Sequence, residues 1–262
     1  MANWALVTGG SSGIGLEFAK DLAVRGYNLV LVARDAKQLK SVQADISSLG
    51  VEVEILHVDL AKRAEVYKVT ARLTDGAKPV EVLVNCAGFV LHVPSVTNNA
   101  KDFAVQEAAM QVMATDVLLL SGAAAFEMKR RGKGVIINVA STTAWAYTGN
   151  YSAIKRWVVS YTEGLAIELS GTGVTATAVC PGWAHTNFHR SGGRAEPRVP
   201  EWLFTDPAVI ARAGLRDAFK GRSLSIPTLR WKVALWFMGH GPLGLGRYFT
   251  RKYLSSRGHS KR

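Results

Sequence analysis

The sequence predicts an α/β fold, doubly wound around a parallel sheet of about seven strands with helices on both faces. Short runs rich in Val and Ile alternate with longer segments whose apolar residues recur at helical spacing. A turn rich in glycine and serine directly follows the first run. Because strands that alternate with helices form right-handed crossovers, the sheet is expected to be parallel and covered on both sides.

Six apolar runs and one later segment are the expected strands. They cover residues 4–8, 28–33, 53–59, 80–85, 135–140 and 174–180, and the segment RSLSIP at 222–227 is the seventh. Helical spacing predicts helices over 15–26, 35–50, 102–131, 151–170 and 205–221. Asp35 and Asp206 are suited to cap the N-termini of two of these helices.

The chain is expected to form a single domain over residues 1–262, because no linker rich in proline or serine and no internal repeat divides it. Within that domain we expect a dinucleotide-binding and catalytic core over 1–186. A substrate lid, a helix and the last strand follow over 187–227, and a basic aromatic extension follows over 228–262.

The glycine-rich turn reads Thr8-Gly9-x-x-x-Gly13-x-Gly15 and lies between the first strand and the first helix. Glycine permits a positive φ, and because it lacks a Cβ it lets the backbone approach a ligand closely. The helix that starts near Ile14 directs its free N–H groups and positive dipole end toward the same space. The turn therefore predicts a phosphate cradle.

Four further segments follow in order and complete a recognisable set. They are VNCAG at 84–88, INVASTT with Ser141, YSAIK with Tyr151 and Lys155, and CPGWAHT at 180–186. Together with the glycine turn, this set resembles the signatures of the short-chain dehydrogenase/reductase family, over roughly the first seven-tenths of the chain. The resemblance is to members that act on 3-oxoacyl or ketosteroid-type lipophilic substrates. It implies a Rossmann fold and NADP-dependent interconversion of a ketone and a secondary alcohol.

Ser141, Tyr151 and Lys155 are the predicted catalytic residues. Tyr151 and Lys155 share one helix face, and an ammonium beside a phenol is expected to lower the pKa of the phenol toward working pH. Such a tyrosine exchanges a proton with the substrate oxygen, and Ser141 hydrogen-bonds the same oxygen. The resemblance implies that Lys155 also binds the nicotinamide ribose.

The second strand ends in Ala33-Arg34, where proteins that use NAD generally place an acid. The Arg34 guanidinium can pair with a 2′-phosphate, so we predict NADP(H) as the cofactor. The resemblance implies that Asp59, after the third strand, contacts the adenine. The predicted cofactor-binding residues are Gly9, Ser11, Ser12, Gly13, Ile14, Gly15, Arg34, Asp59, Leu60, Asn85, Ala87, Gly88, Tyr151, Lys155, Pro181, Gly182 and Thr186.

Two departures from the family pattern keep a second function open. Met113 stands where the family usually has a catalytic asparagine, and a thioether cannot anchor the water through which that asparagine relays protons. Thr115 or Asp116 is a candidate substitute. The interval from Ser141 to Tyr151 is also two or three residues shorter than usual. The alternative function is therefore a catalytically weak or inactive NADP(H)-binding regulator or scaffold.

Charge is concentrated at the C-terminal end of the chain. The net charge is +12; residues 1–186 contribute 17 − 16 = +1, and residues 187–262 contribute 15 − 4 = +11. Residues 228–262 mix these cations with aromatic side chains, and three interpretations stay open. The first is that the segment lies on anionic lipid, and the second is that it packs as part of an apolar substrate tunnel. The third, which has the least support, is that it binds nucleic acid. The first two favour a lipophilic substrate.

The start of the first strand, the cysteines, the histidines and the apolar helices give expectations about location, metal binding and oligomeric state. The first strand begins at Trp4, so no signal peptide is expected, and Cys86 and Cys180 are expected to be buried free thiols in the cytoplasm. The six histidines are scattered, so no metal site is expected. We expect a cytoplasmic protein, with peripheral membrane contact under the lipid interpretation. The long apolar helices predict a homo-oligomer.

Overall fold

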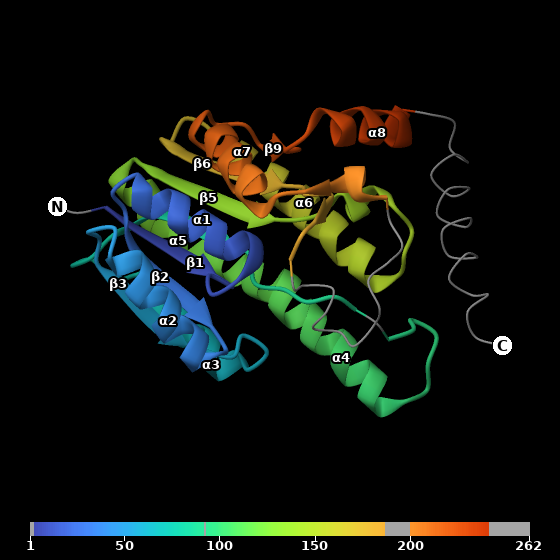
Figure 1. The fold of residues 1–262 in the computed structure, drawn as a ribbon, viewed down its shortest axis with the longest axis horizontal. Coiled ribbons are helices and arrows are strands. Elements are labelled where there is room, and N and C mark those ends of the chain that lie inside the picture. Colours follow the sequence, from blue (N-terminus) through green and yellow to red (C-terminus); the bar gives the residue numbers. More distant parts are fainter. Residues whose placement is uncertain (1–2, 92, 187–199, 241–262) are drawn as a thin grey trace.

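The computed structural model describes residues 3–91, 93–186 and 200–240. Seven parallel strands form one sheet in the order β3-β2-β1-β4-β5-β6-β9 (Figure 1). Their bounds are β1 Trp4–Thr8, β2 Asn28–Ala33, β3 Val53–His57, β4 Val80–Asn85, β5 Gly134–Val139, β6 Val174–Val179 and β9 Leu224–Ser225. The predicted fold class and strand count are confirmed, although β3 ends at His57, two residues earlier than predicted.

Helices cover both faces of the sheet, as the alternating pattern predicted. One face carries α1 (Gly13–Val24), α2 (Ala36–Ser47) and α7 (Pro207–Phe219). The other face carries α3 (Arg63–Leu73), α4 (Ala100–Met110), α5 (Asp116–Arg131) and α6 (Asn150–Glu168). The pleat of β1 divides its side chains between the two cores, with Trp4 and Leu6 on one side and Ala5 and Val7 on the other.

Local sequence signals explain where several helices begin. The Asp35 carboxylate accepts hydrogen bonds from the backbone N–H groups of Lys37 and Gln38, and the Asp206 carboxylate accepts one from Ala208. These bonds satisfy donors that a first helical turn leaves without intrahelical partners. Both predicted N-caps are confirmed.

The helix predicted over 102–131 is wrong in one respect, because it is interrupted. A π-helical segment, η1 (Gln111–Thr115), separates α4 from α5. Residues 100–131 together are long and apolar enough to cross a membrane, with a mean hydropathy of 1.5 over the best window. More than half of that window is buried inside the fold, where α5 packs on β4 and β5, so we describe it as a core helix.

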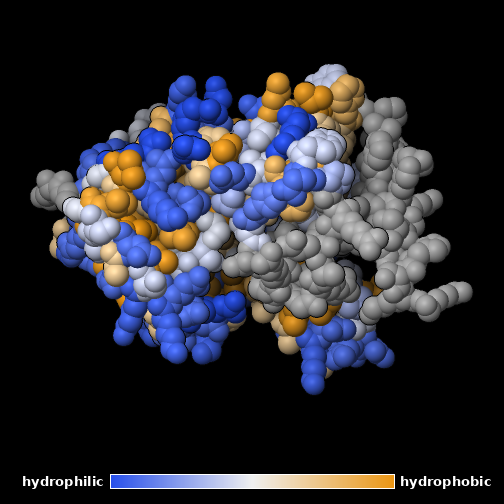
Figure 2. Space-filling model, viewed as in Figure 1, coloured by the Kyte–Doolittle hydropathy of each residue, from blue (hydrophilic) through white to orange (hydrophobic). Residues whose placement is uncertain are grey.

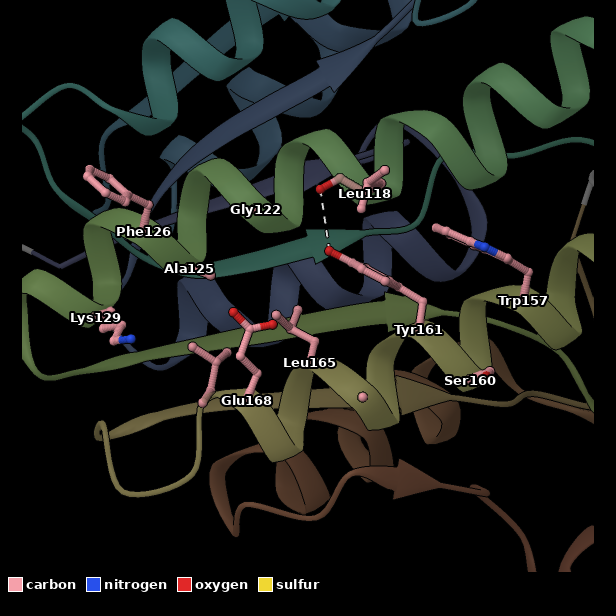
Figure 3. Close-up of a pocket in the computed structure, with 12 residues that line it drawn as sticks. Leu118, Gly122, Ala125, Phe126, Lys129, Trp157, Ser160, Tyr161, Leu165 and Glu168 are labelled. Carbon is pink, nitrogen blue, oxygen red and sulfur yellow. Dashed lines mark hydrogen bonds between the residues drawn. The ribbon is translucent and has the colours of Figure 1, made fainter.

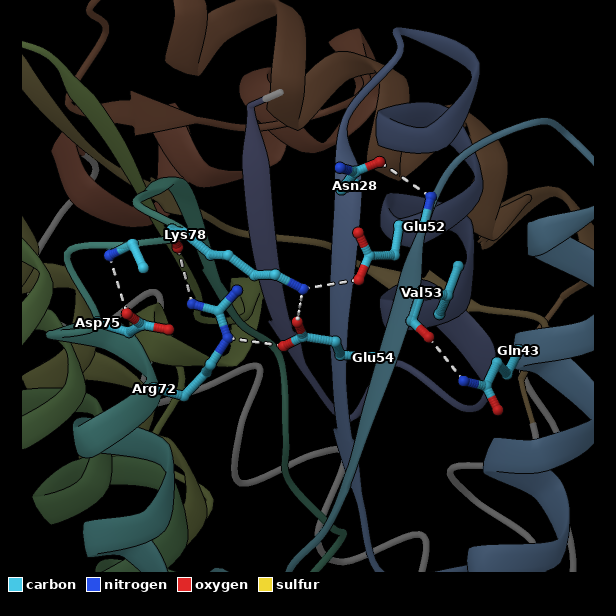
Figure 4. A network of polar contacts seen from close by, with 9 residues as sticks. Asn28, Gln43, Glu52, Val53, Glu54, Arg72, Asp75 and Lys78 are labelled. Carbon is cyan, nitrogen blue, oxygen red and sulfur yellow. Dashed lines mark hydrogen bonds and ion pairs between the residues drawn. The ribbon is translucent and has the colours of Figure 1, made fainter. Parts of the chain in front are cut away.

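The amino ends of the strands are joined by a charged network (Figure 4). Glu54 of β3 pairs with Arg72 of α3 at 2.7 Å and with Lys78 at 2.8 Å, and Lys78 also pairs with Glu52 at 2.7 Å. Both cations lie over the ring of Trp4, at the start of β1. The candidate site described below lies at the opposite, carboxyl ends of the strands.

Four short elements and one helix complete the described chain, and one of the short elements is the 3-10 helix η4 (Glu201–Leu203). A 3-10 helix, η2 (Thr142–Trp145), follows β5, and β7 (Trp183–Ala184) pairs with β8 (Phe204–Thr205). Helix α8 (Leu229–His240) ends the described part of the chain. Residues 187–199, at the start of the predicted lid, and residues 241–262 of the predicted extension lie outside the described residues.

Candidate active site

The glycine turn packs so closely that side chains would not fit in it. Gly9 and Gly13 have φ angles of +68° and +54°. A Cβ built on Gly15 would lie 2.3 Å from the carbonyl oxygen of Gly9, and one on Gly13 would lie 3.2 Å from the Thr186 methyl group. A side chain at Gly9, Gly13 or Gly15 would therefore meet the protein's own atoms, and the Thr186 side chain lies against Gly13. The predicted contact of Thr186 with the cofactor stays a prediction.

Thr8 joins the glycine turn to the segment after β4. Its hydroxyl oxygen accepts hydrogen bonds from the backbone N–H groups of Cys86 and Ala87, at 3.0 and 3.1 Å. A Cβ on Gly9 would lie 3.0 Å from the Cα of Ala87. Two segments almost eighty residues apart in sequence therefore form one surface, because β1 and β4 are neighbours in the sheet.

The start of α1 is open to a ligand. Ser12 occupies the N-cap position but makes no hydrogen bond of its side chain to the helix. The first backbone N–H groups of α1, including that of Ile14, are therefore available to an anion. The neighbouring Ser11 is buried, and its hydroxyl lies 3.4 Å from the Gln38 side-chain oxygen.

The carboxyl ends of β2 and β3 carry the predicted ribose and adenine contacts. Arg34 is exposed and makes no ion pair within the described residues, while its carbonyl oxygen lies 2.9 Å from Nε2 of His57. The Asp59 side chain accepts a hydrogen bond from the backbone of Ala61, and Leu60 is buried. The Arg34 guanidinium thus stays available to an external anion.

Asn85 was predicted to bind the cofactor, but its side chain points into the fold. Its amide nitrogen donates to Ser121 at 3.1 Å and to Asn138 at 2.9 Å, and Asn138 donates to Thr162 at 3.0 Å. This buried network ties β4 and β5 to α5 and α6. The Asn85 side chain therefore holds the frame of the site rather than facing a ligand.

The structure brings the three predicted catalytic residues together. The side chains of Ser141 and Tyr151 are hydrogen-bonded to each other. The Lys155 ammonium lies 5.8 Å from the centre of the Tyr151 ring and donates a hydrogen bond to the carbonyl oxygen of Val139 at 2.9 Å. The last residue of β5, the 3-10 helix η2 and the first turn of α6 thus converge on one point.

Burial sets the electrostatics of this group. Burial raises the pKa of Tyr151 above its usual value, and the hydrogen bond from Ser141 opposes that shift only in part. Burial also lowers the pKa of Lys155 to about 8. The predicted lowering of the Tyr151 pKa is therefore wrong, because removal of the phenol from water is the largest cause of its shift.

The thiols of Cys86 and Cys180 interact electrostatically with Lys155, and burial raises the pKa of each to about 12. Both cysteines are free, as predicted, but only Cys180 is buried by its exposed surface, whereas Cys86 is partly exposed. They act here as neutral, apolar neighbours of Lys155 rather than as nucleophiles.

A contact that the sequence did not predict lies on Gly182. The Trp231 indole of α8 packs on this residue so closely that a Cβ there would lie 2.0 Å from Nε1. The neighbouring Pro181 carbonyl accepts a hydrogen bond from the backbone of Thr142, which follows Ser141. Helix α8 is thereby attached to the segment that carries Ser141, and no spacing rule in the sequence links residue 231 to this place.

Met113 lies where the family pattern has asparagine, inside the π-helical segment. Its sulfur would lie 3.1 Å from a Cβ on Gly88, so Met113 packs beside the segment after β4. Asp116 accepts a hydrogen bond from Gln111 and is almost fully buried at the start of α5. A substitute role for Thr115 or Asp116 stays a prediction.

An open groove of about 740 Å³ lies away from this site, between α5 and α6 (Figure 3). Trp157 stacks on Tyr161 with ring centres 4.9 Å apart, and the Tyr161 hydroxyl donates to the carbonyl oxygen of Leu118 at 3.4 Å. Among the described residues, no cluster of histidine, cysteine and carboxylate side chains is arranged to hold a metal. His92, His189 and His259 lie outside those residues.

Comparison with known proteins gives a consistent result. The family model for short chain dehydrogenases matches residues 3–196. D-beta-hydroxybutyrate dehydrogenase of Cupriavidus necator is 36% identical over 190 residues, which cover 70% of this chain and 70% of that protein. Very-long-chain 3-oxoacyl-CoA reductase of Anas platyrhynchos is 31% identical over 232 residues, covering 83% and 71%. A short-chain dehydrogenase from Sphingobium yanoikuyae, solved in complex with NADPH, has a TM-score of 0.80 at 30% identity, covering 89% and 92%.

Proposed function

This chain belongs to the short chain dehydrogenase family, and on that premise we propose that it is an NADP(H)-dependent oxidoreductase. It interconverts a ketone and a secondary alcohol on a lipophilic substrate. The observation that carries the proposal is the convergence of Ser141, Tyr151 and Lys155 in a fold that also contains the tightly packed glycine turn after β1.

The residues present fit a dinucleotide, because Gly9 and Gly13 are partly exposed and lack side chains, and α1 begins without a side-chain cap. Gly9, Gly13 and the first turn of α1 would hold the pyrophosphate, and Thr186 borders the same space. When bound, the nicotinamide supplies or accepts the hydride. Arg34 would pair with the 2′-phosphate, which favours NADP(H) over NAD(H). The NADPH in the Sphingobium yanoikuyae structure supports this preference.

Tyr151 is assigned the acid–base step. Its raised pKa keeps the phenol protonated at neutral pH, so it can donate a proton to the carbonyl oxygen of a ketone. Ser141 would hydrogen-bond that oxygen as negative charge develops on it. Lys155 places its ammonium beside the phenol and is anchored by the Val139 carbonyl. The protonated phenol is the form that the reduction of a ketone requires.

The relatives support an oxoacyl-type substrate. The names of the two curated relatives describe a hydroxybutyrate dehydrogenase and a very-long-chain 3-oxoacyl-CoA reductase. The Trp231 indole of α8, which packs on Gly182 near the Ser141 segment, favours a substrate with a long apolar part. We therefore propose a 3-oxoacyl chain, with a ketosteroid as the second candidate.

The test is NADPH oxidation with 3-oxoacyl thioesters and ketosteroids, compared with NADH. We expect turnover with NADPH that falls at least about 100-fold in Tyr151→Phe, because the proton donor is removed. Arg34→Ala is expected to raise KM for NADPH about tenfold and leave KM for NADH unchanged. Full turnover in Tyr151→Phe would refute the assigned role of the tyrosine.

A regulator that binds NADP(H) without turnover is the second candidate function, and Met113 is the observation that favours it. Tight NADPH binding with no oxidation across the panel, in both the wild type and Met113→Asn, would support this alternative. A large rate gain in Met113→Asn would instead identify an enzyme that lacks its proton relay.

We also propose that a second copy of the chain covers the groove between α5 and α6. Leu118, Phe126 and Trp157 are exposed there, and burial of such side chains against another copy would stabilise a dimer (Figure 3). Sedimentation velocity measures this directly, and Phe126→Glu is expected to shift the protein to monomer.

A further inference from the structure

Helix α8 is held firmly against the substrate side of the fold. Arg230 donates hydrogen bonds to the carbonyl oxygens of Trp202 and Phe204, and to the Thr205 hydroxyl at 2.6 Å. Trp231 packs on Gly182, and Leu235 is almost fully buried. One side of α8 thus packs against the rest of the protein, and these contacts fix the orientation of the helix.

The outward side of α8 is apolar. Leu229, Val233, Trp236 and Phe237 are 76%, 48%, 58% and 53% exposed. Their spacing of four, three and one residues places them on one helix face. The space-filling view shows hydrophobic atoms along the upper edge of the molecule, over α8 (Figure 2). We call these four residues the α8 stripe.

Positive charge accompanies the stripe. Lys232 is exposed on α8, and the chain that follows, residues 241–262, contains six Lys or Arg and no Asp or Glu. An aromatic and aliphatic stripe next to a run of cations matches the chemistry of a membrane surface, whose interior is apolar and whose lipid headgroups are anionic. A nucleic acid would use the cations but not the exposed aliphatic side chains.

We propose that α8 docks on the surface of an anionic lipid bilayer, with the α8 stripe inserted among the headgroups. Because Trp231 ties α8 to Gly182 and Pro181 holds the segment after Ser141, docking would place the candidate active site beside the membrane. A lipophilic substrate would then reach the site from the bilayer. The docking itself does not rest on the proposed catalytic activity.

The experiment is co-sedimentation of the full chain with vesicles of phosphatidylcholine, with or without about 30% phosphatidylserine. The wild type is expected to bind the mixed vesicles at least about tenfold more tightly than the neutral ones, and high salt is expected to remove most of that preference. Val233→Ser with Phe237→Ser is expected to weaken binding about tenfold or more. Val24→Ser with Leu49→Ser removes exposed apolar surface at the ends of α1 and α2, and is the matched control that should bind as wild type.

Two further measurements keep docking separate from folding and from catalysis. Each variant is first checked by its thermal melt. Brominated lipids should quench tryptophan fluorescence in the wild type, and less so in Trp236→Phe. Tyr151→Phe, which tests the proposed function, should still bind vesicles.

Binding unaffected by the α8 substitutions, or no binding to either vesicle, would overturn the proposal. Self-association or DNA binding that replaces vesicle binding would overturn it too.

Discussion

Asp116 allows a direct test of how burial raises the pKa of a carboxyl group and makes the stability of this protein depend on pH. The residue begins α5, directly after the π-helical segment, and is almost fully buried. One carboxylate oxygen accepts a hydrogen bond from Gln111, and the other has no hydrogen-bond partner among the described residues. Burial raises the pKa of Asp116 to about 6, against the smaller lowering effects of Gln111 and Arg63.

The magnitude follows from linkage between protonation and folding. The pKa rises from 3.8 to about 6, so the folded chain holds this proton more tightly than the unfolded chain does. The stabilising contribution is fully present below the unfolded pKa and is lost as pH rises through about 6. At roughly 1.4 kcal/mol per pKa unit, ionised Asp116 costs about 3 kcal/mol above pH 7, and about 2 kcal/mol of that loss falls between pH 4.5 and 7.5.

The perturbation is Asp116→Asn, which keeps the shape and the acceptor for Gln111 but removes the titration. Urea denaturation at about pH 4.5 and 7.5 should show the variant gaining about 2 kcal/mol relative to wild type across this interval. Asp45→Asn, on the exposed face of α2, is the control and should show no such gain. A difference between Asp116→Asn and wild type that does not change with pH would refute the reasoning.

Three further predictions concern the site. Gly15→Ala, whose Cβ would meet the Gly9 carbonyl oxygen at 2.3 Å, should lower NADPH affinity at least about tenfold in a fluorescence titration; unchanged affinity would contradict the cradle. Because the pKa of Lys155 is lowered to about 8, kcat/KM for ketone reduction should fall about tenfold per pH unit above that value, and a flat profile to about pH 9.5 would exclude this role. Met113→Asn should raise kcat yet lower the stability by about 2 kcal/mol, as urea denaturation would show, since it puts an amide in the buried space beside Gly88.

The parts of the fold that the sequence predicted are those with a local signal. Runs of Val and Ile predicted six strands within about two residues of their ends, and a side-chain oxygen at Asp35 predicted a helix start. The order of motifs along the chain was also enough to group Ser141, Tyr151 and Lys155, because parallel strands bring their carboxyl ends to one edge.

The failures concern properties that depend on distant residues. The pKa of Tyr151 was predicted to fall because Lys155 is four residues away, but the burial that raises it comes from the packed fold. Asn85 belongs to a motif that resembles a strand-stabilising signature, but the sequence did not show that its amide bonds Ser121 and Asn138. The contact of Trp231 with Gly182 joins positions 49 residues apart, and periodicity carries no information about it.

The π-helical segment Gln111–Thr115 determines how the protein would respond to the deletion of one residue. Each residue of a helix turns the chain by about 100°, so an extra residue in one turn sets the faces of α4 and α5 out of phase by that angle. The face of α5 is locked into the core by Val117, Leu120 and Ala124. Deletion of one residue between 111 and 115 would therefore rotate α4 rather than α5. The rotation would break the hydrogen bond that Gln106 of α4 accepts from Asn150 at 2.6 Å. Asn150 begins α6, the helix that carries Tyr151. A deletion here would therefore rotate α4 and disturb the start of the helix that carries Tyr151. The same deletion in a surface turn would change only the conformation of that turn.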